Sequence, residues 1–184
     1  MRFGLLVSAI LAGTMLLTVD ANAQLSREWR SCTGNPDVDW DQQIRSCTAL
    51  IQSVRETTHN RAIAYYNRGL AYRAKGDNDR AIADCTEAIR LDPKYAFAYN
   101  GRGIAYHAKG DNDRAIADYS EAIRLRPKYM YAYFSRGLAN LYAGALPNAL
   151  ADLNQASALD PKYAYDFDEW FAANAELKAL GAAP

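Results

Sequence analysis

The sequence lacks an excess of either charge: its 184 residues carry 21 Lys and Arg against 21 Asp and Glu. A nucleic-acid binder needs a basic face to meet the phosphates, so this balance argues against that class of protein. The charged residues are also interspersed, and the chain has no acidic or basic tail. Aromatic residues are not scarce, at 11%, which argues against a disordered chain. A compact folded domain is expected.

Residues that build metal and catalytic sites are scarce. The two histidines, His59 and His107, lie far apart, and the three cysteines form no CxxC pair, so the ligand spacing of a zinc site is missing. Motifs typical of hydrolases, phosphate loops and zinc proteases are missing too. The segment 77–79 (Asp-Asn-Asp) lacks the glycine and the distal glutamate of a calcium loop. We expect no metal, no cofactor and no catalytic residue, with an enzyme that lacks a recognisable motif as the alternative.

The one long uncharged run, residues 3–19, lies at the N-terminus. Arg2 precedes it and residues 21–23 (Ala-Asn-Ala) follow it, in the order of a charged n-region, an apolar h-region and an A-x-A cleavage site. The run is short for a membrane span and has no basic stop-transfer flank. Residues 1–23 are predicted to form a signal peptide that is cut after Ala23, which gives a periplasmic or secreted protein. A retained membrane anchor is the alternative.

A 34-residue period occupies most of the remaining chain. Residues 62–95 and 96–129 differ at eight positions, and residues 130–163 form a looser third copy. All three copies have small residues at repeat positions 8, 20 and 27, a tyrosine at position 4 and a proline at position 32. The small residues are Gly69, Ala81 and Ala88, then Gly103, Ala115 and Ala122, then Gly137, Ala149 and Ala156. This pattern resembles the tetratricopeptide-repeat family, although Cys85, Asn140 and Leu153 replace aromatic residues of its pattern.

The resemblance implies an all-α, right-handed superhelical solenoid of helix–turn–helix repeats. Local signals agree with two helices per unit. A glycine that suits the left-handed end of a helix follows each first helix, at Gly76, Gly110 and Gly144. Asp77 and Asp111 are suitable N-caps for the second helix, and Pro147 fits the first turn of the third copy's second helix.

An arginine recurs at repeat position 7 and an aspartate at position 23, both near the interface between the two helices of a unit. We predict one structural ion pair in each copy, because an aspartate accompanies every arginine. The predicted pairs are Arg68 with Asp84, Arg102 with Asp118, and Arg136 with Asp152. A ladder of arginines that binds an anionic ligand is the alternative.

The segments beside the three copies are expected to complete the solenoid. Residues 24–61 are predicted to be a degenerate unit, because residues 39–52 align with residues 77–90 as a second helix, whereas the first helix is expected to have decayed within residues 25–33. Residues 164–184 are predicted to form a C-terminal capping helix and tail, since the last repeat must cover an open apolar end.

Two of the three cysteines belong to the degenerate unit. Cys32 and Cys47 are predicted to form a disulfide in an oxidising compartment, where the bond would staple a short segment. Cys85 occupies an aromatic slot of the repeat pattern and is expected to be a buried, inert thiol.

Five of the eight differences between the first two copies fall at repeat positions 2, 5, 6, 9 and 12. Positions 2, 5, 9 and 12 share one face of a helix, and in the family this face lines a concave groove where peptides or partner helices bind. In this chain the face has five aromatic residues and no Lys, Asp or Glu, which favours a contact surface over relaxed drift. The predicted groove residues are Ile63, Tyr66, Asn67 and Arg73, then Phe97, Asn100 and His107, then Tyr131, Phe134 and Leu141. Asn100 and Tyr66 are among those expected to point outward.

The sequence therefore predicts a non-catalytic protein–protein interaction module of the bacterial cell envelope, with a protein or peptide partner and with neither nucleic acid nor a membrane span after signal cleavage. The lysines with which some members of the family clamp a chaperone's C-terminal carboxylate are absent from this face, so that ligand is not expected. Self-association through the aromatic face or the cap, and binding to the cell wall, are the alternatives.

Overall fold

The computed structural model describes residues 23–34 and 38–160, and within these ranges the ordered elements are all helices. A helix over residues 23–32 comes first. It is followed by α2 (Trp40–Gln52), α3 (Thr58–Ala74), α4 (Asn78–Leu91), α5 (Ala96–Ala108), α6 (Asn112–Leu125), α7 (Met130–Tyr142) and α8 (Leu146–Leu159).

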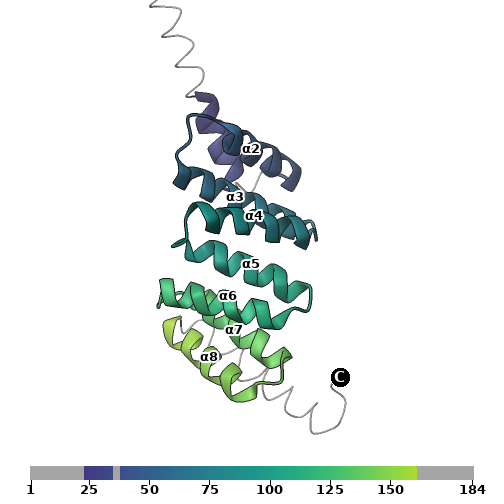
Figure 1. The fold of residues 1–184 in the computed structure, drawn as a ribbon, viewed down its shortest axis with the longest axis vertical. Coiled ribbons are helices and arrows are strands. Elements are labelled where there is room, and N and C mark those ends of the chain that lie inside the picture. Colours follow the sequence, from purple (N-terminus) through teal and green to yellow (C-terminus); the bar gives the residue numbers. More distant parts are fainter. Residues whose placement is uncertain (1–22, 35–37, 161–184) are drawn as a thin grey trace, which may run out of the picture.

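The helices stack in chain order along the long axis of the molecule, with α2 near one end and α8 (Leu146–Leu159) near the other (Figure 1). Each helix packs on its neighbours in the chain, and α3 also contacts α5, as α5 contacts α7. The first helices of the three copies therefore lie side by side and form one continuous face. The predicted all-α solenoid is confirmed. The predicted capping helix and, apart from Ala23, the predicted signal peptide lie outside the described residues.

Each turn between the two helices of a unit is closed by a glycine. Gly76 has a φ of 80°, its N–H donates to the Arg73 carbonyl at 2.8 Å, and the Asp77 N–H donates to the Tyr72 carbonyl at 2.9 Å. This pair of bonds is the Schellman motif, which satisfies carbonyls that the helix end leaves free. Gly110 and Gly144 have the same conformation, with φ of 80° and 76°.

The second helices begin as the sequence predicts. The Asp77 carboxylate accepts a hydrogen bond from the Arg80 N–H at 3.0 Å, and Asp111 does the same with Arg114 at 3.1 Å. In the third copy no side chain caps α8, and Pro147 lies in its first turn instead. A proline costs nothing there, because the N–H that it lacks would have no partner within the helix.

Small residues let the two helices of each unit approach closely. A Cβ atom placed on Gly103 would lie 2.6 Å from Cε1 of Tyr119, far inside van der Waals contact. Tyr119 is 1% exposed and packs with Ala115 of its own helix and Ala139 of α7. The ring therefore occupies the space that glycine leaves, and it joins the second and third copies in one core.

The degenerate unit keeps its first helix, so the expected decay of that helix is wrong. Residues 23–32 are helical, and Leu25 and Trp29 pack against a core that contains Leu50. The Trp29 indole N–H also donates to the Glu56 carboxylate at 2.7 Å. Apolar burial and this hydrogen bond hold the helix although it has lost the repeat pattern.

Cys32 and Cys47 join this first helix to α2. Their sulfur atoms are 2.09 Å apart and their Cα atoms 4.8 Å apart, a Cα separation that a disulfide spans. Both side chains are fully buried. The two cysteines are therefore placed for a covalent link within the degenerate unit.

Candidate functional site

The arginine of each copy is held by two neighbours. Arg68 donates from Nε and Nη2 to the two carboxylate oxygens of Asp84, both at 2.8 Å, and from Nη1 to the Thr48 hydroxyl at 2.9 Å. This hydrogen bonding raises the pKa of the Arg68 guanidinium above its usual value. The next copies repeat the arrangement, with Arg102 on Asp118 and Thr86, and Arg136 on Asp152 and Ser120.

The hydroxyl partner lies in the preceding unit, a contact that our reading of the sequence missed. Its signal was present, because repeat position 25 is Thr86 in the first copy and Ser120 in the second. Each guanidinium thus fastens its own two helices and the unit before it. The donors that an anionic ligand would use are already engaged, which favours the structural role of these arginines over an anion ladder.

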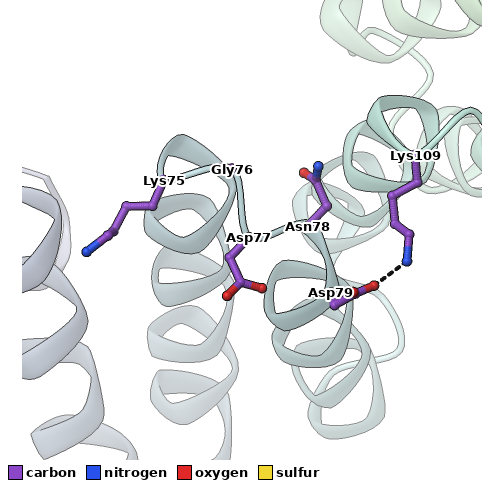
Figure 2. Close-up of a pocket in the computed structure, with 6 residues that line it drawn as sticks. All are labelled: Lys75, Gly76, Asp77, Asn78, Asp79 and Lys109. Carbon is purple, nitrogen blue, oxygen red and sulfur yellow. Dashed lines mark hydrogen bonds and ion pairs between the residues drawn. The ribbon is translucent and has the colours of Figure 1, made fainter.

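The turn between α3 and α4, together with Lys109 at the end of α5, lines a shallow polar hollow formed by Lys75, residues 76–79 and Lys109 (Figure 2). Asp77 caps α4 and pairs with Arg80, while Asp79 pairs with Lys109 and Lys75 reaches back to Asp41. Within residues 23–34 and 38–160, no cluster of three His, Cys, Asp or Glu side chains is arranged to hold a metal ion. The carboxylates in this hollow serve capping and pairing.

A row of rings crosses the face formed by α3, α5 and α7, and we call it the aromatic ladder. It consists of Tyr66, Tyr95, Phe97, Tyr129 and Tyr131. Ring centres are 5.3 Å apart for Tyr66 and Tyr95, 5.9 Å for Tyr95 and Phe97, 5.1 Å for Phe97 and Tyr129, and 6.2 Å for Tyr129 and Tyr131. These separations are typical of favourable edge-to-face pairs.

Three of the five ladder rings were predicted groove residues, namely Tyr66, Phe97 and Tyr131. Tyr95 and Tyr129 were missed. They stand at repeat position 34, just before the first helix of the next copy, and the recurrence of tyrosine there was the available signal. Tyr131, at the end of the ladder, is 53% exposed.

Three phenols of the ladder, those of Tyr66, Tyr95 and Tyr129, are electrically neutral at neutral pH. Burial raises the pKa of Tyr95 to about 12 and raises the pKa of Tyr66 and Tyr129 still further above the usual value. Charge on this surface therefore comes from other side chains, and the ladder itself supplies ring faces and neutral hydroxyl groups.

The prediction that Asn100 points outward is wrong. The residue is 5% exposed, and its Oδ1 atom has no hydrogen-bond partner in the part of the chain that the structure describes. Its amide lies beside the Tyr129 phenol, where it offsets part of the rise that burial causes in the pKa of Tyr129. A helical position alone does not reveal this burial, because the covering ring comes from the segment that precedes α7.

Tyr66 is half-buried rather than outward-facing, and its ring lies across the next unit. A Cβ atom on Gly101 would lie 3.1 Å from Cε2 of Tyr66 and 3.3 Å from Sγ of Cys85. Gly101 therefore leaves room for the ring, and the short Cys85 side chain leaves space beside it. Cys85 is buried as expected, and burial raises the pKa of its thiol to about 12.

The other end of the face, at repeat position 12, is more polar. Arg73 is exposed and takes part in no ion pair among the described residues. His107 is tied to its own unit, with Nδ1 2.6 Å from Oδ1 of Asn112, and its ring centre is 5.1 Å from that of Tyr142. The remaining predicted groove residues are half-buried: Ile63, Asn67, Phe134 and Leu141.

The family of the chain follows from comparison with known proteins. Three sequence profiles of the tetratricopeptide repeat match residues 62–95, 85–117 and 105–142. A search of curated proteins found no match.

Solved structures give the same answer. The crystal structure of MamA is 32% identical over 68% of this chain and 71% of MamA, with a TM-score of 0.59. The second repeat domain of Spaghetti (RPAP3), solved with an HSP90 peptide, is 30% identical over 54% of this chain and 92% of that domain, with a TM-score of 0.53. The second domain of human RPAP3, in complex with an HSP70 peptide, is 30% identical over 57% and 88%, with a TM-score of 0.55. The chain belongs to the tetratricopeptide-repeat family.

Proposed function

We propose that this protein is a non-catalytic interaction module of the bacterial cell envelope that binds a segment of a partner protein on the face of α3, α5 and α7. The observation that carries the proposal is the aromatic ladder. Its rings form a continuous row across three units, and Tyr131 at its end is 53% exposed. Rings held by their neighbours lose little conformational entropy on binding, which makes them effective contact residues.

The relatives support a peptide as the partner. Both RPAP3 domains were solved with a chaperone peptide, and each aligns with more than half of this chain. The chaperone peptide itself is not the ligand that we propose, because this face lacks the lysines of the carboxylate clamp. Ring packing with a few polar contacts is the mode of binding that the residues of this face favour.

Photo-crosslinking in cells tests the proposal. A photoreactive amino acid replaces Tyr131, and a control probe replaces Arg90, an exposed residue of α4. We expect a discrete protein adduct from position 131 alone, and we expect Phe97→Ala to abolish it. Equal labelling from both positions, or none, would rule out this face as the binding surface. Asn100 is unsuitable as a probe position, because it is buried.

We also propose that the protein is exported and that Cys32 and Cys47 are oxidised. The apolar N-terminal run supports export, and the contact of the two sulfur atoms supports the bond. Protein isolated from the periplasm or medium and denatured without reductant should take up one alkyl group per chain, on Cys85. Reduction should raise this to three. Uptake of three groups without reductant would contradict the disulfide.

Self-association is a second candidate, and the end of the solenoid favours it. Leu150 is 45% exposed, whereas Ile82 and Ile116 at the same repeat position are half-buried. Tyr142 and Leu146, nearby in the chain, are 70% and 36% exposed. A second copy that packed on this surface would bury these side chains. Light scattering decides: a monomer removes the second copy, and a dimer that Leu150→Glu dissociates supports it.

A further inference from the structure

Three of the eight differences between the first two copies meet around one residue, Tyr129. In the second copy they place Phe97, Asn100 and Arg126 beside it. The guanidinium carbon of Arg126 lies 4.9 Å from the centre of the Phe97 ring and 5.6 Å from that of Tyr129. The part of the repeat that has diverged therefore gathers at the middle of the aromatic ladder.

The first copy carries the opposite charge at the same position. Asp92 replaces Arg126 there, and its carboxylate lies 3.1 Å from Nδ1 of His59. The ring of His59 in turn lies 6.4 Å from that of Tyr95. One end of the ladder thus carries Asp92 beside His59, whereas the middle carries Arg126.

Arg126 forms no ion pair within residues 23–34 and 38–160. No carboxylate of the described residues lies within ion-pair distance of it, whereas Arg80, Arg90, Arg114 and Arg124 each pair with an acid three residues away. Arg126 is also exposed. A guanidinium that lies over rings keeps its N–H donors in its own plane, where they remain available to a carboxylate.

Asn100 adds an unused acceptor at the same place. Its Oδ1 atom is buried beside Tyr129, and no described residue forms a hydrogen bond with it, although Asn100 is only 5% exposed. A buried acceptor without a donor costs free energy, so a ligand N–H that reached it would be bound favourably. A peptide backbone offers such an N–H at every residue except proline.

We propose that Arg126, Asn100 and the rings around Tyr129 form a recognition site for an acidic residue of a partner peptide. The Asp or Glu side chain accepts hydrogen bonds from Arg126, a backbone N–H donates to Asn100, and an adjacent apolar side chain packs on Phe97 and Tyr131. This inference rests on the proposed function, because it names the chemistry of the segment that the face would bind.

The test is a selection of random short peptides, displayed on phage, on the purified full chain. We expect the selected peptides to carry Asp or Glu next to an apolar residue. A selected peptide, fluorescently labelled and amidated at its C-terminus, is then titrated and followed by anisotropy. Arg126→Ala should weaken its binding about tenfold or more, the effect of losing a hydrogen bond to a charged group. Arg126→Asp should instead select basic peptides.

Arg114→Ala is the matched control. Arg114, on α6, is an exposed arginine that lies over the ring of Tyr106. Its loss should leave the affinity within about twofold, the scatter expected for residues outside a contact. Circular dichroism checks that all variants keep their helices.

The outcomes separate the two proposals. Selected peptides without an acidic preference, or acidic peptides that bind Arg126→Ala unchanged, would overturn this inference while the face remained a binding surface. Binding that requires a free C-terminal carboxylate on the peptide would overturn the proposal that Arg126 binds an Asp or Glu side chain. Peptides whose binding ignores both Phe97→Ala and Tyr131→Ala, or a selection that enriches none, would overturn the inference and the proposed function together.

Discussion

At the scale of single residues, the arginine of each copy has the largest structural consequence. Arg102 satisfies both oxygens of Asp118, whose side chain is 8% exposed, and reaches Thr86 in the preceding unit. A buried carboxylate without its cation is costly, because neither water nor another charge then stabilises it. Asp118 can therefore be buried as a charged group only because Arg102 binds it.

Replacing Arg102 with methionine tests this requirement. We expect Arg102→Met to lower the free energy of unfolding by about 3 kcal/mol or more, because Asp118 stays buried and loses its partner. The double variant Arg102→Met/Asp118→Leu should recover most of that loss. Urea denaturation of the two variants and of Asp118→Leu measures the coupling.

Arg124→Met is the control, since Arg124 forms an exposed pair with Glu121 and should matter little. A double variant no more stable than Arg102→Met would show that the cost lies in lost packing and not in the stranded charge.

The sequence predicted these pairs, although it misplaced Asn100. A recurrent arginine with a recurrent aspartate defines both partners by itself, whereas the burial of Asn100 depends on a ring that a different segment supplies. Position on a helix gives the direction of a side chain but not what covers it. The role of a residue could therefore be predicted where both interacting residues recur in every copy. It could not be predicted where a residue outside the helix determines whether the side chain is buried.

At the scale of helices, the first two copies fill the same space in different ways. The first has Tyr66 with Cys85, and the second has Asn100 with Tyr119. Tyr66 and Cys85 both lie against Gly101, so the large ring comes from α3 in one copy and from the second helix, α6, in the other. Packing at native density ties the two positions together.

Giving positions 66 and 85 the residues of the second copy should show that their packing energies are coupled. We expect Cys85→Tyr alone to overpack the space next to Tyr66 and to cost about 1–3 kcal/mol of unfolding free energy. Tyr66→Asn alone should cost about 2 kcal/mol through lost packing. The double variant, which has the residues of the second copy, should lose less unfolding free energy than the two single variants lose together, by about 1 kcal/mol or more. Thermal and urea denaturation give the values, and strict additivity would contradict the shared space.

Two glycines of the fold serve different purposes, and alanine distinguishes them. Gly103→Ala drives a Cβ atom to 2.6 Å from the buried ring of Tyr119, so we expect a loss of about 2 kcal/mol or more, despite alanine's better helix propensity. Gly76→Ala meets nothing within 4 Å and suffers only from its φ of 80°, so its loss should be about 1 kcal/mol.

Denaturation midpoints with a common m-value compare the two glycine variants. Equal losses would mean that the close approach of α5 and α6 is relieved by small shifts. A larger loss for Gly76→Ala would reverse the ranking and would place the critical constraint in the turn.

Most helix ends were predictable because they are set by local chemistry. α5 and α7 begin where the copies begin, at Ala96 and Met130. The exception is α3, which starts at Thr58, ahead of the first copy, with Thr57 as its N-cap. The helix over residues 23–32 was missed for another reason: tertiary packing of Trp29 stabilises a segment whose repeat pattern has been lost.

At the scale of the whole molecule, the buried phenols and the thiol make stability depend on alkaline pH. Burial raises the pKa of Tyr95 and of Cys85 to about 12, from usual values of 10.0 and 9.0. Burial also raises the pKa of Tyr66, Tyr119 and Tyr129. The folded state therefore holds these protons more tightly than the unfolded state does.

The sign of the effect follows from linkage. A raised folded-state pKa contributes stability that is complete below the unfolded pKa and is lost as the pH rises through the folded one. We expect the melting temperature to fall from about pH 9 to about pH 12, the window between the ordinary and the raised pKa values. Calorimetry, together with phenolate absorbance, measures both changes. A melting temperature constant over this window would contradict the burial of these groups.

The bond from each arginine to the preceding unit makes the chain extensible. A second copy of residues 96–129, inserted after Tyr129, would contain an arginine together with its own aspartate. That arginine would donate a hydrogen bond to Ser120 in the unit before it. Its own serine would in turn receive Arg136 of the unit after it. Growth by tandem duplication then needs no compensating substitution at this joint. Length becomes a quantity that evolution can change in steps of one repeat, and each step would widen the binding face while leaving both ends of the solenoid as they are.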